Sequence, residues 1–185
     1  MHLPLRTHRL VLRALTLDDL DDHHRLFSDP DVVRFLYDEP LTRDEAAAHL
    51  AGRLGAELPV DGGWMNLAVE HDDTYVGEVG LAVSRPEHRQ CEIGYSFLPE
   101  AHGRGYATEA AAAMLALCFD ELDAHRVAGR IEARNEASAR LLERLGMRRE
   151  AHLRENEFVK GEWNDEVIYA ITEDEWRERE ASTGS

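Results

Sequence analysis

The sequence has few cysteines: it contains only two. Cys91 and Cys118 do not form a Cys-x-x-Cys pair, so two buried thiols fit better than a disulfide or a redox pair. No apolar run approaches the ~20 residues that a membrane-spanning helix needs. The opening residues MHLPLRTHRLVLRALT also lack the apolar core and cleavage site of a signal peptide. These absences predict a cytoplasmic protein with no membrane partner.

Basic residues are also scarce, with 21 Lys and Arg against 37 Asp and Glu, a formal net charge of −16. Such a surface repels a nucleic-acid backbone, so we expect no nucleic-acid partner. The same charge would attract a cationic substrate, although a surface that serves only solubility explains it equally well. We therefore expect Trp64, Trp163 and Trp176 in the core or at an interface, and not in a platform for stacking bases.

Metal-binding motifs are missing, although the chain has ten histidines. There is no His-Glu-x-x-His motif and no compact His/Cys set, so we expect no metal. His23 and His24 are adjacent in a helical segment, and we expect them on its polar face.

The pattern of apolar residues predicts one α+β domain over residues 1–181, with a frayed tail at 182–185. Alternation predicts strands over residues 8–15, 64–71, 74–84, 90–98, 125–133, 151–158 and 165–172. Helical spacing and capping residues predict helices over residues 16–27, 31–37, 42–58, 107–121, 135–146 and 173–180. Turns are expected over residues 59–63 and 159–162.

A glycine loop connects the strand at 90–98 to the helix at 107–121. The first N–H groups of a helix lack internal partners, and the helix dipole adds about half a positive charge there. Gly103 and Gly105 would let a ligand approach the backbone, and Arg104 could add charge. The loop lacks G-x-x-x-x-G-K-[ST], and it fails G-x-G-x-x-G because Thr108 occupies the last glycine position. Taken alone, it could equally be a structural turn.

The segment IGYSFLPEAHGRGYATEA resembles the cofactor motif Q/R-x-x-G-x-G/A of the GCN5-related N-acetyltransferases, the GNAT family. The six positions run from His102 to Ala107, and only His102 departs from the pattern. THRLVLRAL, SDPDVVRFL and RNEASARLLERLGMRREAHLRE resemble the RimJ/RimL-like branch in the same order. The resemblance implies the GNAT fold: a mixed, mostly antiparallel sheet of about seven strands flanked by helices, with strands splayed at the acetyl-CoA site.

The resemblance implies acetyl-CoA as co-substrate, with its pantetheine arm on backbone groups of the strand before the loop and its pyrophosphate on the loop. The side chains of Ile93, Tyr95 and Phe97 alternate as one strand face and are expected in the core. Asn135 is implied as a cofactor contact, and it also suits a helix N-cap. The implied cofactor-binding residues are Phe97, Leu98, His102, Gly103, Arg104, Gly105, Tyr106, Ala107, Thr108 and Asn135.

Direct transfer to an amine needs a proton acceptor, because an attacking amine must be neutral. The resemblance implies Glu157 as the base, with Glu92 as second candidate and a chain of waters as a third route. Many relatives use a tyrosine of the late helix as acid to the leaving thiolate, but that position is Leu142 here. The branch offers Ser138 in its place, as a hydrogen-bond donor.

The resemblance therefore implies an acetyl-CoA-dependent N-acetyltransferase that acts on a primary amine through a ternary complex. The acceptor is left open between a protein N-terminus, a small amine such as a polyamine, and an aminoglycoside-type antibiotic. A non-catalytic sensor that binds acyl-CoA is the alternative from another class. A homodimer through the late strands is compatible with the resemblance.

Overall fold

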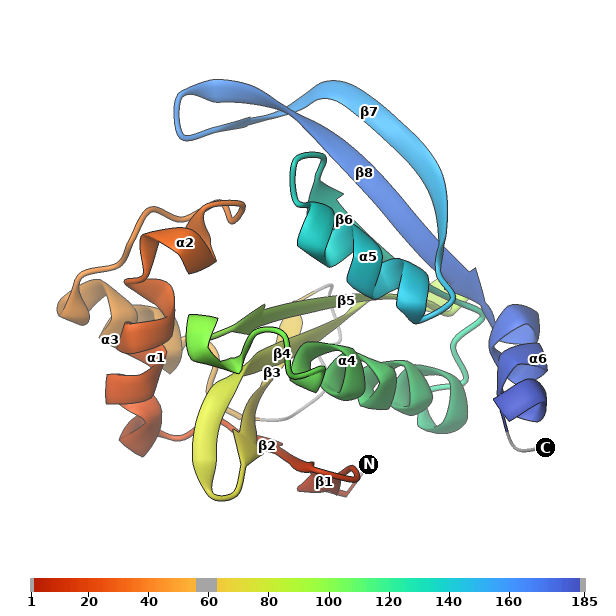
Figure 1. Ribbon diagram of the computed structural model, residues 1–185, viewed down its shortest axis with the longest axis horizontal. Coiled ribbons are helices and arrows are strands. Elements are labelled where there is room, and N and C mark those ends of the chain that lie inside the picture. The colour runs from red at the N-terminus through yellow and green to blue at the C-terminus, as the bar shows by residue number, and fades with distance from the viewer. Residues whose placement is uncertain (1, 56–62, 184–185) are drawn as a thin grey trace.

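The computed structural model describes residues 2–55 and 63–183, and the eight strands in this part of the chain form one sheet (Figure 1). Their order across the sheet is β1-β2-β3-β4-β5-β6-β8-β7. The strands are β1 (Leu5–Arg6), β2 (Leu10–Ala14), β3 (Trp64–His71), β4 (Thr74–Arg85), β5 (Gln90–Phe97), β6 (Arg126–Glu132), β7 (Arg148–Val159) and β8 (Glu162–Thr172). The helices are α1 (Leu20–Phe27), α2 (Pro30–Val33), α3 (Arg43–Ala51), α4 (Tyr106–Ala116), α5 (Glu136–Arg144) and α6 (Glu173–Thr183).

The sheet opens between β5 and β6, its one parallel pair among the described residues. Pairing there covers only residues 90–92 of β5 and 126–128 of β6, whereas β5 continues to Phe97 and β6 to Glu132. All the other neighbouring strands described pair antiparallel. The expected mixed, mostly antiparallel sheet with splayed strands is therefore confirmed, with β1 as an eighth strand.

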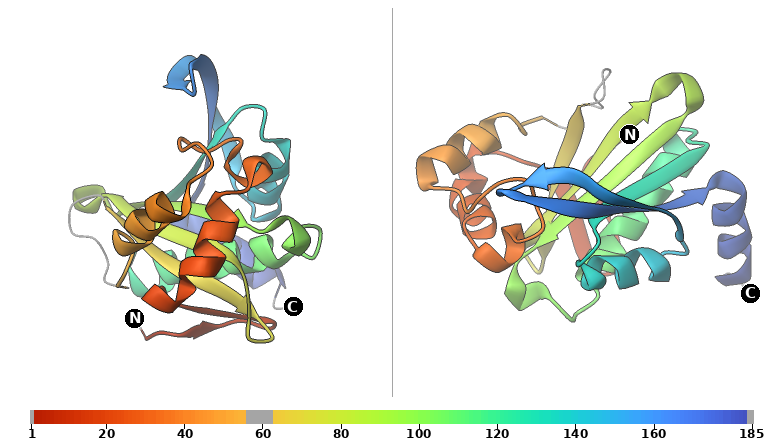
Figure 2. Two further views of the ribbon diagram at one scale, coloured as in Figure 1. Left: turned by 90° about the vertical axis from the view of Figure 1, so that its left-hand side faces the viewer. Right: turned by 90° about the horizontal axis from the view of Figure 1, so that it is seen from above.

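Helices cover both faces of the sheet (Figure 2). Side chains of a strand alternate between faces, so neighbouring residues of β3 enter different cores. Leu67 belongs to the larger core, which includes residues of α4 and α5. Ala68 belongs to a smaller core with α1, α2 and α3. The β5–β6 opening is thus bordered by α4 and α5 on one side and approached by α2 on the other.

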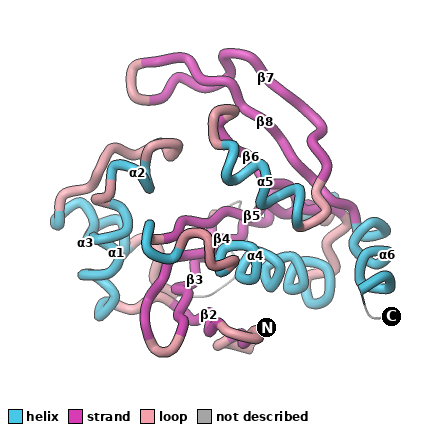
Figure 3. Tube along the Cα trace, viewed as in Figure 1, coloured by secondary structure: helices cyan, strands magenta, loops and turns pink. Residues whose placement is uncertain are grey.

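Two helices end earlier than the sequence predicts (Figure 3). The helix predicted over 31–37 ends at Val33, where the Leu36 N–H donates to the Val33 carbonyl at 2.9 Å and tightens the chain into a turn. The helix predicted to residue 58 ends at Ala51, because Gly52 caps it and a tight turn follows. Most of the predicted turn at 59–63 lies outside the described residues. At the other end of the chain, α6 extends to Thr183, beyond the predicted end at 180.

One predicted environment is wrong. His23 is fully buried and does not lie on a polar helix face. Its ring is compatible with burial because it has a polar partner in the Glu78 carboxylate of β4, with Nδ1 and Oε1 2.5 Å apart. Trp176 is buried and stacks on Phe119, as expected of a core residue. Trp64 and Trp163 are 45% and 61% exposed and lie outside the core, so for these two the interface alternative stays a prediction. The two cysteines are free and buried, as predicted.

Candidate active site

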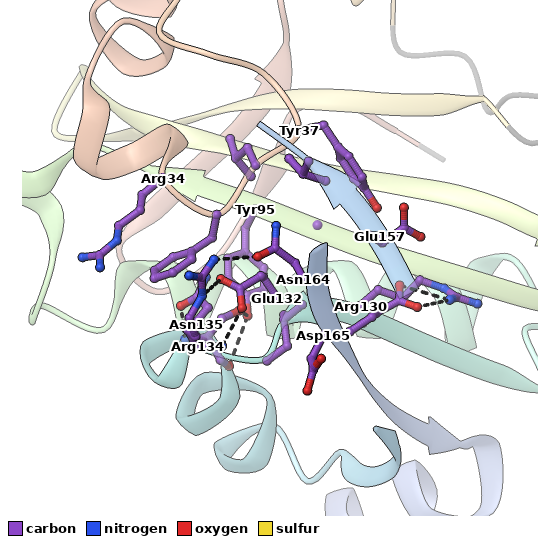
Figure 4. A pocket seen from close by; sticks show the side chains of 18 of the residues that line it. Arg34, Tyr37, Tyr95, Arg130, Glu132, Arg134, Asn135, Glu157, Asn164 and Asp165 are labelled. Carbon is purple, nitrogen blue, oxygen red and sulfur yellow. Dashed lines mark hydrogen bonds and ion pairs between the residues drawn. The ribbon is translucent and has the colours of Figure 1, made fainter. Parts of the chain in front are cut away.

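A cavity of about 250 Å³ lies where β5 and β6 diverge (Figure 4). Its walls are β5, β6, the start of α5, the segment after α2 and the β7–β8 hairpin. Ionisable side chains of both signs line it, and the carboxylates are in excess. The carboxylates are Glu92, Glu132, Glu157, Glu162, Asp165 and Glu166, and the cations are Arg34, Arg130, Arg134 and Lys160.

All four residues proposed from the sequence for the chemistry and the late helix line this cavity: Glu92, Asn135, Ser138 and Glu157. They come from β5, the N-terminus of α5 and β7, segments far apart along the chain. The predicted glycine-loop residues do not line it, and they lie at the start of α4, which follows the free end of β5. The glycine loop therefore lies at the end of β5, outside the cavity lining.

Arg130 separates two of the carboxylates. Its guanidinium lies 3.3 Å from Glu92 Oε2 and 3.2 Å from Glu166 Oε2. Burial raises the pKa of Glu92, which Arg130 opposes and the neighbouring Glu166 reinforces. Glu157 is half-buried; among the described residues it forms no ion pair, and the Asn156 amide donates to it at 3.2 Å. Of the two candidate bases, Glu92 is therefore in an ion pair and Glu157 is not, among the described residues.

Arg134 holds the β6–α5 connection against β8. Its guanidinium donates to Glu132 Oε2 at 2.9 Å, to Glu162 Oε1 at 2.7 Å and to Asn164 Oδ1 at 2.7 Å. The Asn135 side chain then caps α5, accepting the Ser138 N–H at 3.1 Å. This confirms the N-cap expected for Asn135 and fixes where Ser138 lies.

Tyr95 reaches Ser138 from β5. The two hydroxyl oxygens are 2.6 Å apart, and both residues line the cavity. The expectation that Tyr95 is a core side chain is therefore incomplete, since its ring packs against the core while its hydroxyl is at the site. Burial raises the pKa of Tyr95 to about 12, against which the Ser138 hydrogen bond acts.

Aromatic side chains from outside β5 also line the cavity. Tyr37 follows α2 and Trp64 begins β3, and both are substantially exposed at the cavity. The indole of Trp64 lies across two glycines: a Cβ on Gly80 would stand 2.9 Å from the ring, and one on Gly94 would stand 3.3 Å from it. The absence of side chains at these positions leaves the space that the indole occupies.

The glycine loop has the backbone that its sequence predicts. Gly103 and Gly105 have φ of +72° and +79°, a region that favours glycine, and Gly105 precedes the first residue of α4. A Cβ on Gly103 would meet no described atom within 4 Å, so this side of the loop is open. Arg9 secures the other side, donating to the Arg104 carbonyl at 2.9 Å and pairing with Glu109 at 2.7 Å.

The backbone groups expected to hold the pantetheine arm are already engaged within the chain. The Phe97 carbonyl accepts a hydrogen bond from His102 Nε2 at 3.0 Å. The Leu98 N–H donates to the Val76 carbonyl at 3.0 Å, and the Leu98 carbonyl accepts from Ala101 at 2.9 Å. The histidine that departs from the family pattern thus folds back onto the strand end.

The β7–β8 hairpin roofs the cavity and reaches α2 (Figure 1). At the turn, Lys160 Nζ donates to the Val33 carbonyl at 2.7 Å, which joins the hairpin to the end of α2. Around it, Phe158 and Trp163 form an exposed aromatic pair with centroids 5.2 Å apart. The hairpin that covers the cavity therefore comes from the last part of the chain, whereas the glycine loop precedes α4.

Residues 2–55 and 63–183 contain no cluster of three or more His, Cys, Asp or Glu arranged to hold a metal ion. Within the same ranges, every helix is too short or too polar to span a membrane.

A mixed sheet splayed beside a glycine loop at a helix start is the architecture of GNAT acetyltransferases, and residues 9–148 match the family model described as an acetyltransferase (GNAT) domain. The chain belongs to this family and is an N-acetyltransferase. It is similar to the uncharacterised N-acetyltransferase YnaD of Bacillus subtilis, with 31% identity over 175 residues, 93% of this chain and 98% of that protein.

Two other similarities bear on the fold and the site. The crystal structure of a GNAT-family acetyltransferase from Bacillus anthracis has a TM-score of 0.83 and 30% identity, covering 92% of this chain and 98% of that one. The spermidine N(1)-acetyltransferase of Escherichia coli K12 is 27% identical over 164 residues, 89% of this chain and 86% of that protein. GNAT enzymes use acetyl-CoA as acetyl donor.

Proposed function

We propose that this enzyme moves the acetyl group of acetyl-CoA directly onto a primary amine of a small, positively charged acceptor such as a polyamine. The observation that carries the proposal is the acidic excess of the cavity, where six carboxylates face four cations. Arg130 and Arg134 are each bound to two of these carboxylates, and Lys160 donates to a backbone carbonyl. The net charge of −16 of the whole chain also attracts cations. The E. coli relative named as a spermidine acetyltransferase is in keeping with this acceptor.

For the donor, we assign the pyrophosphate to the start of α4. The open side of Gly103 leaves space for an anion beside the first N–H groups of the helix, and Arg104 adds a positive charge. The Phe97 and Leu98 carbonyls each retain a second lone pair for the pantetheine arm. Because Asn135 Oδ1 caps α5, its contact with the donor falls on Nδ2. The donor-binding set is Phe97, Leu98, His102, Gly103, Arg104, Gly105, Tyr106, Ala107, Thr108 and Asn135.

For the proton, we assign Glu157 as the base that accepts it from the attacking amine. Its carboxylate lines the cavity and has no cation bound to it among the described residues, so a cationic acceptor can approach it. Glu92 is the second candidate, and its raised pKa suits a base, but Arg130 occupies its Oε2. Bound acetyl-CoA supplies an activated thioester carbonyl, and we assign Ser138, which lines the cavity, as the hydrogen-bond donor to the sulfur that leaves.

The test is release of CoA thiol from acetyl-CoA with a panel of polyamines, aminoglycosides and peptides with free N-termini. We expect the polyamines to give the highest kcat/KM. Glu157→Gln should lower kcat by about 10²- to 10⁴-fold, the range for a lost general base, while CoA still binds in calorimetry. Glu87→Gln makes the same chemical change at an exposed site away from the cavity and should leave kcat unchanged.

Each other outcome has a distinct meaning. If peptides or aminoglycosides are acetylated faster than polyamines, the proposed acceptor is wrong. The assignment of the acetyl-CoA site is not affected by that result. CoA binding with no thiol release for any acceptor would support a non-catalytic sensor. Full activity of Glu157→Gln, with loss of activity in Glu92→Gln, would move the base to β5.

A further inference from the structure

The contact between Tyr95 and Ser138 crosses the opening of the sheet. Tyr95 lies on β5 beyond Glu92, the last residue of that strand to pair with β6, and Ser138 lies in the first turn of α5. Their hydroxyl oxygens are 2.6 Å apart, and the Tyr95 hydroxyl is also 3.4 Å from the Ser138 carbonyl. Ser138 is buried apart from a small exposed fraction, and both side chains line the cavity.

Two hydroxyls in contact carry two hydrogens, and their mutual bond uses one of them. A separation of 2.6 Å is at the short end of the range for O–H···O bonds. When Tyr95 donates to Ser138, the serine hydrogen is directed elsewhere, and polarisation along the chain strengthens the bond that it makes.

We propose that Tyr95 is a positioning residue for acetyl transfer: by donating to Ser138 Oγ, it aims the serine O–H at the leaving sulfur of acetyl-CoA. The proposal rests on the acetyl transfer proposed above. The equivalent of the late-helix tyrosine in many relatives is Leu142 here, a buried side chain without a donor. The Tyr95 hydroxyl on β5, acting through Ser138, contributes to the hydrogen bond that Leu142 cannot donate from the helix.

The pair donates a hydrogen bond and keeps its protons. In the reaction the N–C bond forms, the C–S bond breaks with its electron pair on sulfur, and the proton lost from nitrogen goes to the carboxylate base. The pKa of Tyr95, raised by burial to about 12, lies well above the ~8.5 of an ordinary thiol. Tyr95 therefore stays protonated when the thiolate forms, and it stabilises the thiolate through Ser138 without neutralising it.

The experiment compares Tyr95→Phe, Ser138→Ala, the double variant and Ser138→Thr. A hydrogen bond to a charged group corresponds to about 10- to 100-fold in rate, so we expect Ser138→Ala to lower kcat within that range and Tyr95→Phe by about tenfold. The double variant should be no worse than Ser138→Ala, because both remove one relay. Ser138→Thr retains the hydroxyl and should restore most of kcat, and KM for acetyl-CoA should change less than twofold in Tyr95→Phe.

A second readout needs no acceptor. The pKa of the bound CoA thiol, followed by its ultraviolet thiolate absorbance or by the pH dependence of the CoA dissociation constant, should rise by about one unit in Tyr95→Phe. Tyr169→Phe is the matched control: its hydroxyl donates to Glu143 at 3.2 Å outside the active-site cavity, and its loss should leave both kcat and the bound thiol pKa unchanged.

Unchanged kcat and bound thiol pKa in a folded Tyr95→Phe would overturn the proposal. Equal losses in Tyr95→Phe and Tyr169→Phe would overturn it as well, since the effect would then be structural. A wild type that binds CoA but acetylates no amine refutes the proposed acceptor, and the bound thiol pKa still decides the role of Tyr95. A wild type that does not bind CoA would refute both.

Discussion

Replacing Gly103 by alanine separates the anion-binding role of the glycine loop from its backbone strain. Gly103 has φ of +72°, and a Cβ there would meet no described atom within 4 Å. Gly161, in the β7–β8 turn, has φ of +80° and the same open surroundings, and it does not line the cavity. The two sites are therefore matched in strain and in packing, and they differ in that only Gly103 lies in the loop that we assign to the pyrophosphate.

Both Gly103→Ala and Gly161→Ala should lower the free energy of unfolding by about 1–2 kcal/mol, the cost of a left-handed conformation for a residue with a Cβ. In the loop, the added methyl group also stands on the open side to which we assign the pyrophosphate. Loss of one hydrogen bond to a charged oxygen costs about 1.5–3 kcal/mol, so the CoA dissociation constant should rise about 10- to 100-fold in Gly103→Ala alone.

Urea unfolding measures the first effect, and calorimetric titration with CoA measures the second. If both variants lose stability equally and bind CoA equally well, the reasoning about the loop is refuted. If both lose CoA affinity by the same factor, the effect comes from destabilisation and not from the anion site.

Other predictions concern the base, the buried network and pH. Glu157→Gln should lower kcat strongly with CoA affinity retained, measured by thiol release and calorimetry. His23→Ala should lower the free energy of unfolding by about 1–3 kcal/mol, because the buried Glu78 loses its shortest contact and keeps the Tyr75 hydroxyl and the Arg53 guanidinium as partners; a loss below about 1 kcal/mol in urea unfolding would contradict this. Burial, aided by Arg53 and His23, lowers the pKa of His49 to about 4 in the folded state. Unfolded chains then bind more protons below pH ~6.5, so stability should fall as the pH decreases from ~6.5 to ~4. His49→Gln should flatten that part of a stability–pH curve.

The order of the elements could be predicted from the sequence, because apolar alternation within each segment marks the strands. The glycines at 103 and 105 mark the loop before α4. The resemblance to the GNAT family added the splayed strands, which no local pattern encodes. Glu92, Asn135, Ser138 and Glu157, which the sequence proposes for the site, all line one cavity, and their roles stay predictions. Helix ends were harder, because α2 and α3 stop at single tight turns.

The residues that sequence reasoning missed depend on contacts between distant segments. Tyr95 alternates with Ile93 and Phe97 as a core residue does, but β6 leaves β5 after Glu92 and exposes its hydroxyl to the opening. His23 sits among polar neighbours, and its partner Glu78 is 55 residues away. Trp64 reaches the site across glycines of two other strands. Each of these contacts joins residues that are far apart in the sequence, so no short segment of the sequence predicts it.

The bond between the hairpin turn and α2 has a practical consequence, because Lys160 is the single lysine of the chain. An amine-reactive fluorophore therefore has one ε-amine to label, and this amine belongs to a residue that lines the cavity. Labelling rates at that side chain report how often the hairpin leaves Val33, with and without an acceptor present. Mass spectrometry after incubation with acetyl-CoA likewise reads self-acetylation of side-chain amines at one position, so the enzyme carries its own reporter for hairpin opening.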